Sequence, residues 1–300
     1  MNYEKYRWLK WDFQNIAYGK DERQTLDIAI PPQKDAHAIV YIHGGAYMMG
    51  DKSYYPSFLE GYAQNNVVAS INYRLVSADG NIGMKNILAD VDHALRKAIG
   101  FSNSHGVNIK GIILVGHSAG GHLGLLYGYR FKKIGKHRIA ACISLAGPTD
   151  FTDDIGWSSM SMWGKTIEER LSFISWLGSR LTGTKIKLEQ HNWTKQKTYP
   201  AFVKRLLAMS PLVYVFGKGP IPPTLLVHAP SDNQVPYSNA TRLKNALDRM
   251  SIPHALITTT GKEDNHMLGG EEGVRRWYCE DRVWVTETKK WLEGYLDGGV

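Results

Sequence analysis

The chain has 300 residues, 43% of them hydrophobic, and its 36 lysine and arginine against 28 aspartate and glutamate residues give a net charge of +8. This length and apolar content allow one large core, so we expect residues 1–300 to form a single domain. The basic residues are spread along the chain and no nucleic-acid recognition motif accompanies them. The charge therefore indicates a solvated surface, and we expect no nucleic-acid partner.

The cysteines and the N-terminal residues bear on the cellular compartment. Cys142 and Cys279 lie far apart and form no CxxC pair, which argues against a disulfide framework or a zinc site. Charged and aromatic residues occupy the N-terminal stretch where a signal peptide needs an apolar core. No apolar run reaches the roughly 18 residues of a membrane span. We expect a cytoplasmic protein, and the sequence does not indicate its oligomeric state.

Short apolar segments alternate with amphipathic ones along most of the chain. Residues 12–19 and 25–31 predict an opening antiparallel pair of strands, which Pro31 and Pro32 end. The elements expected after this pair are strands at 38–45 and 66–74, a helix at 87–99, a strand at 111–118, a helix at 119–129, strands at 138–147 and 222–230, a helix at 238–250, a strand at 254–261 and a helix at 287–296. This alternation predicts an α/β fold with a mostly parallel central sheet flanked by helices.

One segment, residues 151–209, interrupts this alternation. It contains no convincing strand, and it is too long for an ordinary loop. Its apolar residues are spaced as in a helix at 167–181. Because the segment follows a strand whose carboxyl end faces the usual ligand crevice of such sheets, we expect a helical cap insertion over that edge.

The sequence "GHSAG" at residues 116–120 lies between a predicted strand and a predicted helix. A serine hydroxyl is a weak nucleophile, so it needs an exposed oxygen and an adjacent base. In a GxSxG turn the glycines at 116 and 120 allow the sharp bend that exposes the serine. Ser118 is therefore the candidate nucleophile, because the pattern occurs in the required strand-turn-helix context.

A second glycine pattern, "YIHGGAY", follows the strand at 38–45. The N–H groups of Gly45 and Ala46, together with that of Ala119 directly after the serine, predict an oxyanion hole. We also expect substrate contacts from His43, Tyr47 and His117, since they belong to or adjoin the two glycine patterns; His43 and His117 would shape the pocket.

An acid and a base are expected later in the chain, each just after a strand. Asp232 follows the strand at 222–230, and His266 lies in a polar loop after the strand at 254–261. Asp150 and Asp264 are the rival acids. Asp150 follows another strand, whereas Asp264 is too near His266 in sequence to orient it.

These segments resemble the α/β-hydrolases of the esterase and lipase group that carry an HGG oxyanion motif. "HGGAYMMGDK", "NYRL", "GHSAGGHLG", "SLAGPTDF", "PPTLLVHAPSDNQVP" and "NH" occur in that family's order over residues 25–296. The chain is most similar to bacterial carboxylesterases, including feruloyl and acetyl-xylan esterase-like members, and to kynurenine formamidases. It departs from the family where Ala46 replaces a third glycine, where "HAP" replaces HG, and where Asn265 precedes the histidine.

The resemblance implies a nucleophile at Ser118, an acid at Asp232 and a base at His266. We expect a serine carboxylesterase that forms an acyl-enzyme on small or aromatic esters, without a cofactor or metal. Trp157, Met160 and Trp163 of the cap predict an apolar pocket for this small-molecule ester. An arylformamidase or other amide hydrolase would use the same residues, and a hydrolase-fold binding protein would keep the scaffold without the chemistry.

Overall fold

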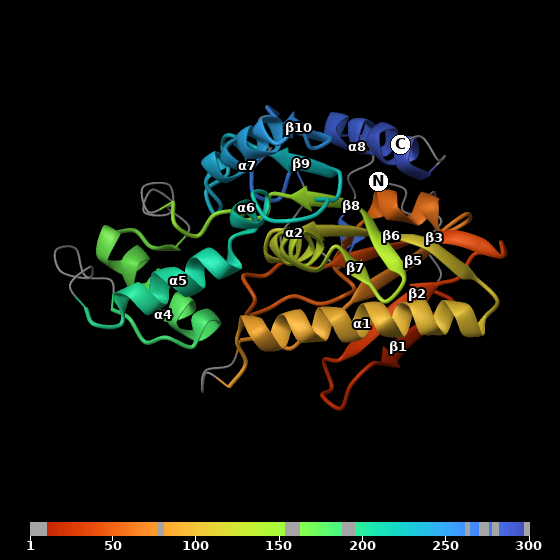
Figure 1. The fold of residues 1–300 in the computed structure, drawn as a ribbon, viewed down its shortest axis with the longest axis horizontal. Coiled ribbons are helices and arrows are strands. Elements are labelled where there is room, and N and C mark those ends of the chain that lie inside the picture. The colour runs from red at the N-terminus through yellow and green to blue at the C-terminus, as the bar shows by residue number, and fades with distance from the viewer. Residues whose placement is uncertain are drawn as a thin grey trace, which may run out of the picture.

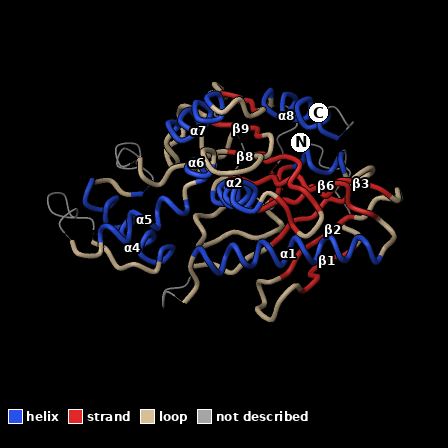
Figure 2. Tube along the Cα trace, viewed as in Figure 1, coloured by secondary structure: helices blue, strands red, loops and turns tan. Residues whose placement is uncertain are grey.

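A nine-stranded mixed sheet forms the centre of the molecule (Figures 1 and 2). The computed structural model describes residues 11–76, 81–153, 163–187, 196–261, 265–269, 276–277 and 282–296. The strands of the sheet are β1 (Phe13–Ala17), β2 (Thr25–Ala29), β3 (Asp35–Ile42), β5 (Val67–Ile71), β6 (Asn108–His117), β7 (Lys133–Ile134), β8 (His137–Leu145), β9 (Thr224–His228) and β10 (His254–Thr258). Their order is β1-β2-β5-β3-β6-β8-β9-β10, with β7 paired to β8.

The sheet is parallel from β5 to β10, and β1, β2 and β7 pair with their neighbours in antiparallel fashion. In β3, Val40 packs into the core on one face of the sheet, and its neighbour Tyr41 packs into the core on the other. Because successive side chains point to opposite faces, a strand that is covered on both sides is apolar along nearly its whole length. The continuous apolar runs of the sequence therefore mark the central strands.

Helices cover both faces of this sheet (Figure 1). The helices whose side chains pack on one face are α1 (Met84–Ser104), α2 (Ala119–Phe131) and α7 (Tyr237–Arg249). The other face is packed by α8 (Val283–Leu296) and by the 3₁₀-helix η2 (Ser57–Tyr62). The predicted α/β class and its mostly parallel sheet are confirmed.

The insertion contributes α4 (Ile167–Thr182) and α5 (Tyr199–Met209), and the short α6 (Pro211–Tyr214) follows. The side-chain oxygen of Thr166 accepts the N–H of Glu169 at the start of α4, and Gly183 ends the helix with a φ of +65°. These local signals place α4 within one residue of the helix predicted at 167–181. The described parts of residues 151–209 contain no strand, in agreement with the sequence. The single-domain organisation stays a prediction.

The sequence missed only very short strands. β7 has two residues, and so do β4 (Tyr55–Pro56) and β11 (Arg276–Trp277), which pair with each other. A two-residue strand is too short to show an alternation of apolar and polar residues, and its position depends on the strand with which it pairs. The closing helix also begins at Val283 rather than at residue 287.

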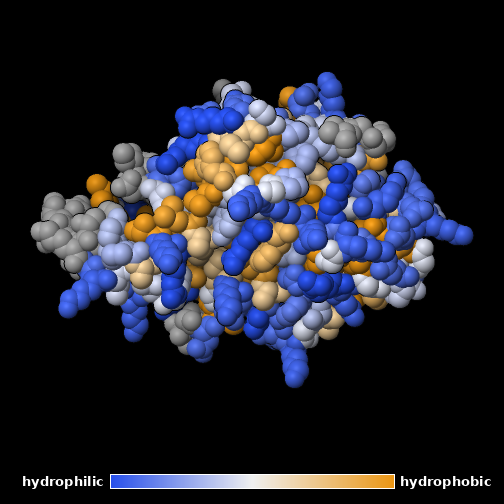
Figure 3. Space-filling model, viewed as in Figure 1, coloured by the Kyte–Doolittle hydropathy of each residue, from blue (hydrophilic) through white to orange (hydrophobic). Residues whose placement is uncertain are grey.

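The face of the molecule in Figure 3 carries hydrophilic side chains over α1 and apolar ones gathered over α5 and α6. Leu207, Val213 and Phe216 are the exposed apolar residues of that region. α1 is amphipathic: its apolar side packs on the sheet, and its hydrophilic side faces the solvent. Among the helices that the structure describes, none has both the length and the apolar content to cross a membrane.

Candidate active site

Ser118 lies at a sharp bend between β6 and α2, with a φ of +52°. A side chain at position 116 would bring its Cβ within 2.3 Å of the carbonyl group of Gly120, and one at position 120 would bring its Cβ within 1.9 Å of the carbonyl oxygen of Ile42. Only glycine fits at either position, so the chain can turn from strand to helix while the serine side chain faces outward. The conformation is costly for a non-glycine residue, and such strain is common at reactive positions.

The structure brings Ser118, His266 and Asp232 together at the carboxyl end of the sheet. The His266 Nε2 atom lies 2.8 Å from the Ser118 Oγ atom, and its Nδ1 atom lies 2.9 and 3.1 Å from the two Asp232 carboxylate oxygens. All three residues are buried beneath the cap side of the molecule. If Asp232 accepts the Nδ1 hydrogen, then Nε2 is free to accept the serine proton, which is the tautomer that base catalysis requires.

The Asp232 carboxylate is held by more than His266. Its Oδ1 atom accepts the backbone N–H groups of Gln234 and Val235, and its Oδ2 atom lies 3.1 Å from the His228 Nε2 atom. Burial raises the pKa of Asp232, but the hydrogen bonds from His228 and His266 more than offset burial, so its pKa lies well below the usual value. The carboxylate is therefore ionised, and two histidines share its charge.

His228 is also 3.1 Å from the carbonyl oxygen of Val235, so its Nε2 carries the hydrogen. We predict that His228→Leu lowers kcat/KM about tenfold, because a charge-assisted hydrogen bond to Asp232 is lost. His228→Gln offers an amide N–H at a similar place and should restore most of the rate. Equal kcat/KM values for all three proteins would show that His228 only packs.

The predicted oxyanion residues lie near the serine. Ala46 and Ala119 line the same cavity as Ser118, and their N–H groups have no hydrogen-bond acceptor among the described residues. Gly45, Ala46 and Tyr47 all have positive φ values, of 106°, 50° and 65°, which turn this loop sharply after β3. Gly45 does not line the cavity, and its carbonyl oxygen accepts the N–H groups of Met48 and Met49 in this turn. The role of the Gly45 N–H in the oxyanion hole stays a prediction.

His43 and His117 are buried and lie beside the cavity rather than in its lining. The His43 ring stacks on Tyr73 and bonds through Nδ1 to the Gly44 carbonyl at 2.7 Å. The His117 Nε2 atom lies 2.8 Å from the His266 carbonyl oxygen, so it fixes the loop that carries the base. Both histidines support the site from behind, and their contacts with a substrate stay a prediction.

A third buried histidine connects the nucleophile helix to the cap. The His122 Nε2 atom donates to the carbonyl oxygen of Met209 at 2.7 Å, and its Nδ1 atom lies 2.8 Å from the Tyr47 hydroxyl. The sequence is consistent with a packing or hydrogen-bonding role for His122, but it does not reveal that the end of α5 returns to α2. Burial lowers the pKa of His122 to about 4, of His43 to about 4 and of His117 to about 3.

These lowered values predict a loss of stability in mild acid. The unfolded chain takes up protons on these histidines below about pH 6.5, whereas the folded chain does not until about pH 4 or lower. Each of these histidines therefore lowers the free energy of unfolding by about 1.4 kcal/mol for every unit by which the pH falls across that window. Urea unfolding at about pH 7.5 and pH 5 measures the difference. His122→Gln should reduce the slope, and an unfolding free energy equal at both pH values would contradict the prediction.

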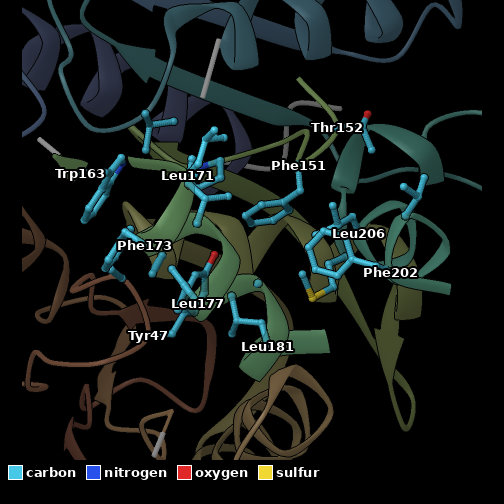
Figure 4. Close-up of a pocket in the computed structure, with 18 of the residues that line it drawn as sticks. Tyr47, Phe151, Thr152, Trp163, Leu171, Phe173, Leu177, Leu181, Phe202 and Leu206 are labelled. Atoms are coloured by element: carbon cyan, nitrogen blue, oxygen red, sulfur yellow. The ribbon is translucent and has the colours of Figure 1, made fainter. Parts of the chain in front are cut away.

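A largely apolar cavity opens at Ser118 and extends beneath α4 and α5 (Figure 4). Tyr47 and Trp163 line it, and their contact with a substrate stays a prediction. The Trp163 ring stacks on Phe173 at 4.6 Å, and its indole N–H donates to the carbonyl oxygen of Gln234, next to the loop of the acid. Trp157 and Met160 lie outside the described residues.

Of the two rival acids, Asp150 is not part of this arrangement. The Asp150 carboxylate forms a salt bridge of 2.9 Å with Arg242 and accepts the hydroxyl of Thr152. Asp264 lies outside the described residues. Within the part of the chain that the structure covers, no three metal-binding side chains are placed to hold an ion.

The strand order, the bend at Ser118 and the hydrogen-bonded chain from this serine through a buried histidine to a buried aspartate define an α/β-hydrolase. Residues 26–247 match the BD-FAE family model, and the chain belongs to this family.

Individual relatives are more distant. The isoprenylcysteine alpha-carbonyl methylesterase ICME of Arabidopsis thaliana is 23% identical to this chain over 267 residues. The match covers 83% of this chain but 55% of that protein, so the chain spans about half the length of this curated relative. Esterase B from Lactobacillus rhamnosis in a phosphonate-inhibited form has a TM-score of 0.69 at 17% identity, covering 95% of this chain and 85% of that one. A truncated carbohydrate esterase from gut microbiota has a TM-score of 0.67 at 20% identity, covering 95% and 96%.

Proposed function

We propose that the protein is a serine carboxylesterase, with Ser118 as nucleophile, His266 as base and Asp232 as the residue that orients it. The observation that carries the proposal is the continuous hydrogen-bonded chain from the Ser118 oxygen through His266 to the ionised Asp232. The relatives support ester cleavage over amide cleavage, because their names describe esterases.

The reaction proceeds in two steps. His266 takes the proton of Ser118 as the oxygen attacks the ester carbonyl, and the N–H groups of Ala46 and Ala119 bind the oxyanion that forms. The carbon–oxygen bond of the alcohol then breaks, and His266 gives the proton to the leaving alcohol. Water repeats the sequence on the acyl-enzyme, which releases the carboxylic acid and restores the serine.

A fluorophosphonate probe tests the proposal directly. We expect one covalent adduct, on Ser118 in peptide mass spectra, and hydrolysis of p-nitrophenyl acetate that this adduct abolishes. A parallel panel of anilides and N-formylkynurenine separates an amide hydrolase from an esterase. A chain that neither reacts with the probe nor hydrolyses any of these compounds would be a binding protein, and the proposal would be wrong. The cytoplasmic location and the lack of a nucleic-acid partner stay predictions.

A further inference from the structure

We propose that this active site acts on esters that carry a hydrocarbon group of about six to ten carbon atoms in the cavity beneath the cap. The inference rests on the proposed esterase function and adds the class of substrate. It is drawn from the lining, the size and one wall of that cavity.

The lining offers almost nothing to a polar group. Among the described residues that line the cavity, none is charged. Three of the polar side chains there are already engaged: the Tyr47 hydroxyl with His122, the Trp163 indole with Gln234, and the Thr152 hydroxyl with Asp150. A sugar ring in this space would lose its water without gaining hydrogen bonds, and that is unfavourable.

The remaining lining is aliphatic and aromatic. Figure 4 shows Trp163 and Phe173 at one side of the cavity and Phe202 and Leu206 at the other, with Phe151 between them. The volume is about 210 Å³. Since a cavity of about 150 Å³ holds one benzene molecule, with its six carbon atoms, this cavity holds on the order of eight carbon atoms. A single acetyl group would leave most of the cavity unfilled.

Leu181 and Met209 form one wall of the cavity. Each is only 5% exposed, and both also line a second groove, of about 870 Å³, between α1, α2 and the ends of α4 and α5. The wall between the two spaces therefore consists of these two side chains. It sets the longest chain that fits, and shortening either side chain would connect the cavity to the outer groove.

Chain-length profiles test the inference. The substrates are p-nitrophenyl acyl esters and n-alkyl acetates from two to sixteen carbons, each below its critical micelle concentration, with acetylated methyl xyloside as the sugar ester. In at least one series kcat/KM should rise about threefold for each added methylene, since each one buries more apolar surface, up to a limit at about six to ten carbons. The acyl and alkyl series together tell which side of the ester occupies the cavity.

Three variants locate the wall. Leu181→Ala and Met209→Ala should each move the optimum at least two carbons longer, and Leu181→Trp should shorten it. Leu207→Ala is the matched control, because Leu207 lies on α5, is 39% exposed and lines neither space. Its profile should equal that of the parent. Circular dichroism and thermal unfolding verify that each variant folds.

A protein that hydrolyses p-nitrophenyl acetate and is labelled at Ser118, but prefers acetylated methyl xyloside or has flat profiles in both series, would overturn this inference alone. Unshifted optima in folded Leu181 and Met209 variants would overturn the role of the wall. Failure of both labelling and acetate hydrolysis would instead overturn the esterase function itself.

Discussion

Ser118→Ala should lower kcat for p-nitrophenyl ester hydrolysis by about 10⁶-fold, to a rate near the background set by binding and the oxyanion groups. The reason is geometric: the Ser118 oxygen is the hydroxyl that lies 2.8 Å from the His266 Nε2 atom at the mouth of the cavity. Alanine preserves the backbone at this bend and removes a single oxygen atom. The rate is measured with enzyme whose active sites have been titrated, so that traces of parental protein do not contribute.

Ser102→Ala is the matched control for this experiment. Ser102 is also a buried serine, but its hydroxyl donates to the Ala98 carbonyl within α1, away from the cavity. It should keep the parental rate. Hydrolysis by Ser118→Ala at the parental rate, with an unchanged circular dichroism spectrum, would exclude Ser118 as the nucleophile.

Asp232→Asn should lower kcat by about 10⁴-fold with little change in fold. The amide no longer accepts the Nδ1 hydrogen of His266, so the histidine turns to the tautomer that cannot take the serine proton. The loss should appear in kcat rather than in KM, because Asp232 lies behind His266 and does not line the cavity. Steady-state kinetics with one acyl ester at about pH 8 measure both constants.

Asp150→Asn distinguishes the two candidate acids. Asp150 is as deeply buried as Asp232 and follows a neighbouring strand, but it pairs with Arg242. This variant should keep most of its activity and lose some stability. The opposite pattern, with Asp150→Asn inactive and Asp232→Asn active, would reverse the assignment of the acid.

The sequence predicted the features that depend on local patterns. Continuous apolar runs marked the parallel strands, and the glycines around Ser118 marked the bend that a strand-to-helix turn requires. The loops after β9 and β10 were found because candidate acids and bases in such folds follow strands. Asp232 and His266 thus appeared as candidates without any knowledge of their distance.

The contacts that tie distant segments together were not predictable in this way. The hydrogen bond from His122 to Met209 joins residues 87 positions apart, and that from Trp163 to Gln234 joins residues 71 positions apart. Both depend on where the cap helices dock, which single-chain periodicity does not specify. His228 and Asp232 are only four positions apart in the sequence. A histidine at the end of a strand, close to the candidate acid, is the sequence feature that could have predicted their contact.

The edge of the sheet at β10 affects how the protein loses activity on heating. β10 is the last strand in the described order, it pairs only with β9, and its residues are half-buried or exposed. The loop that carries His266 leaves the sheet from this strand. Edge strands open locally at a lower free energy than central strands do. Heating should therefore separate the imidazole from the serine while most of the core is still folded. The half-life of the activity at high temperature then measures the opening of this edge strand and not the unfolding of the whole protein.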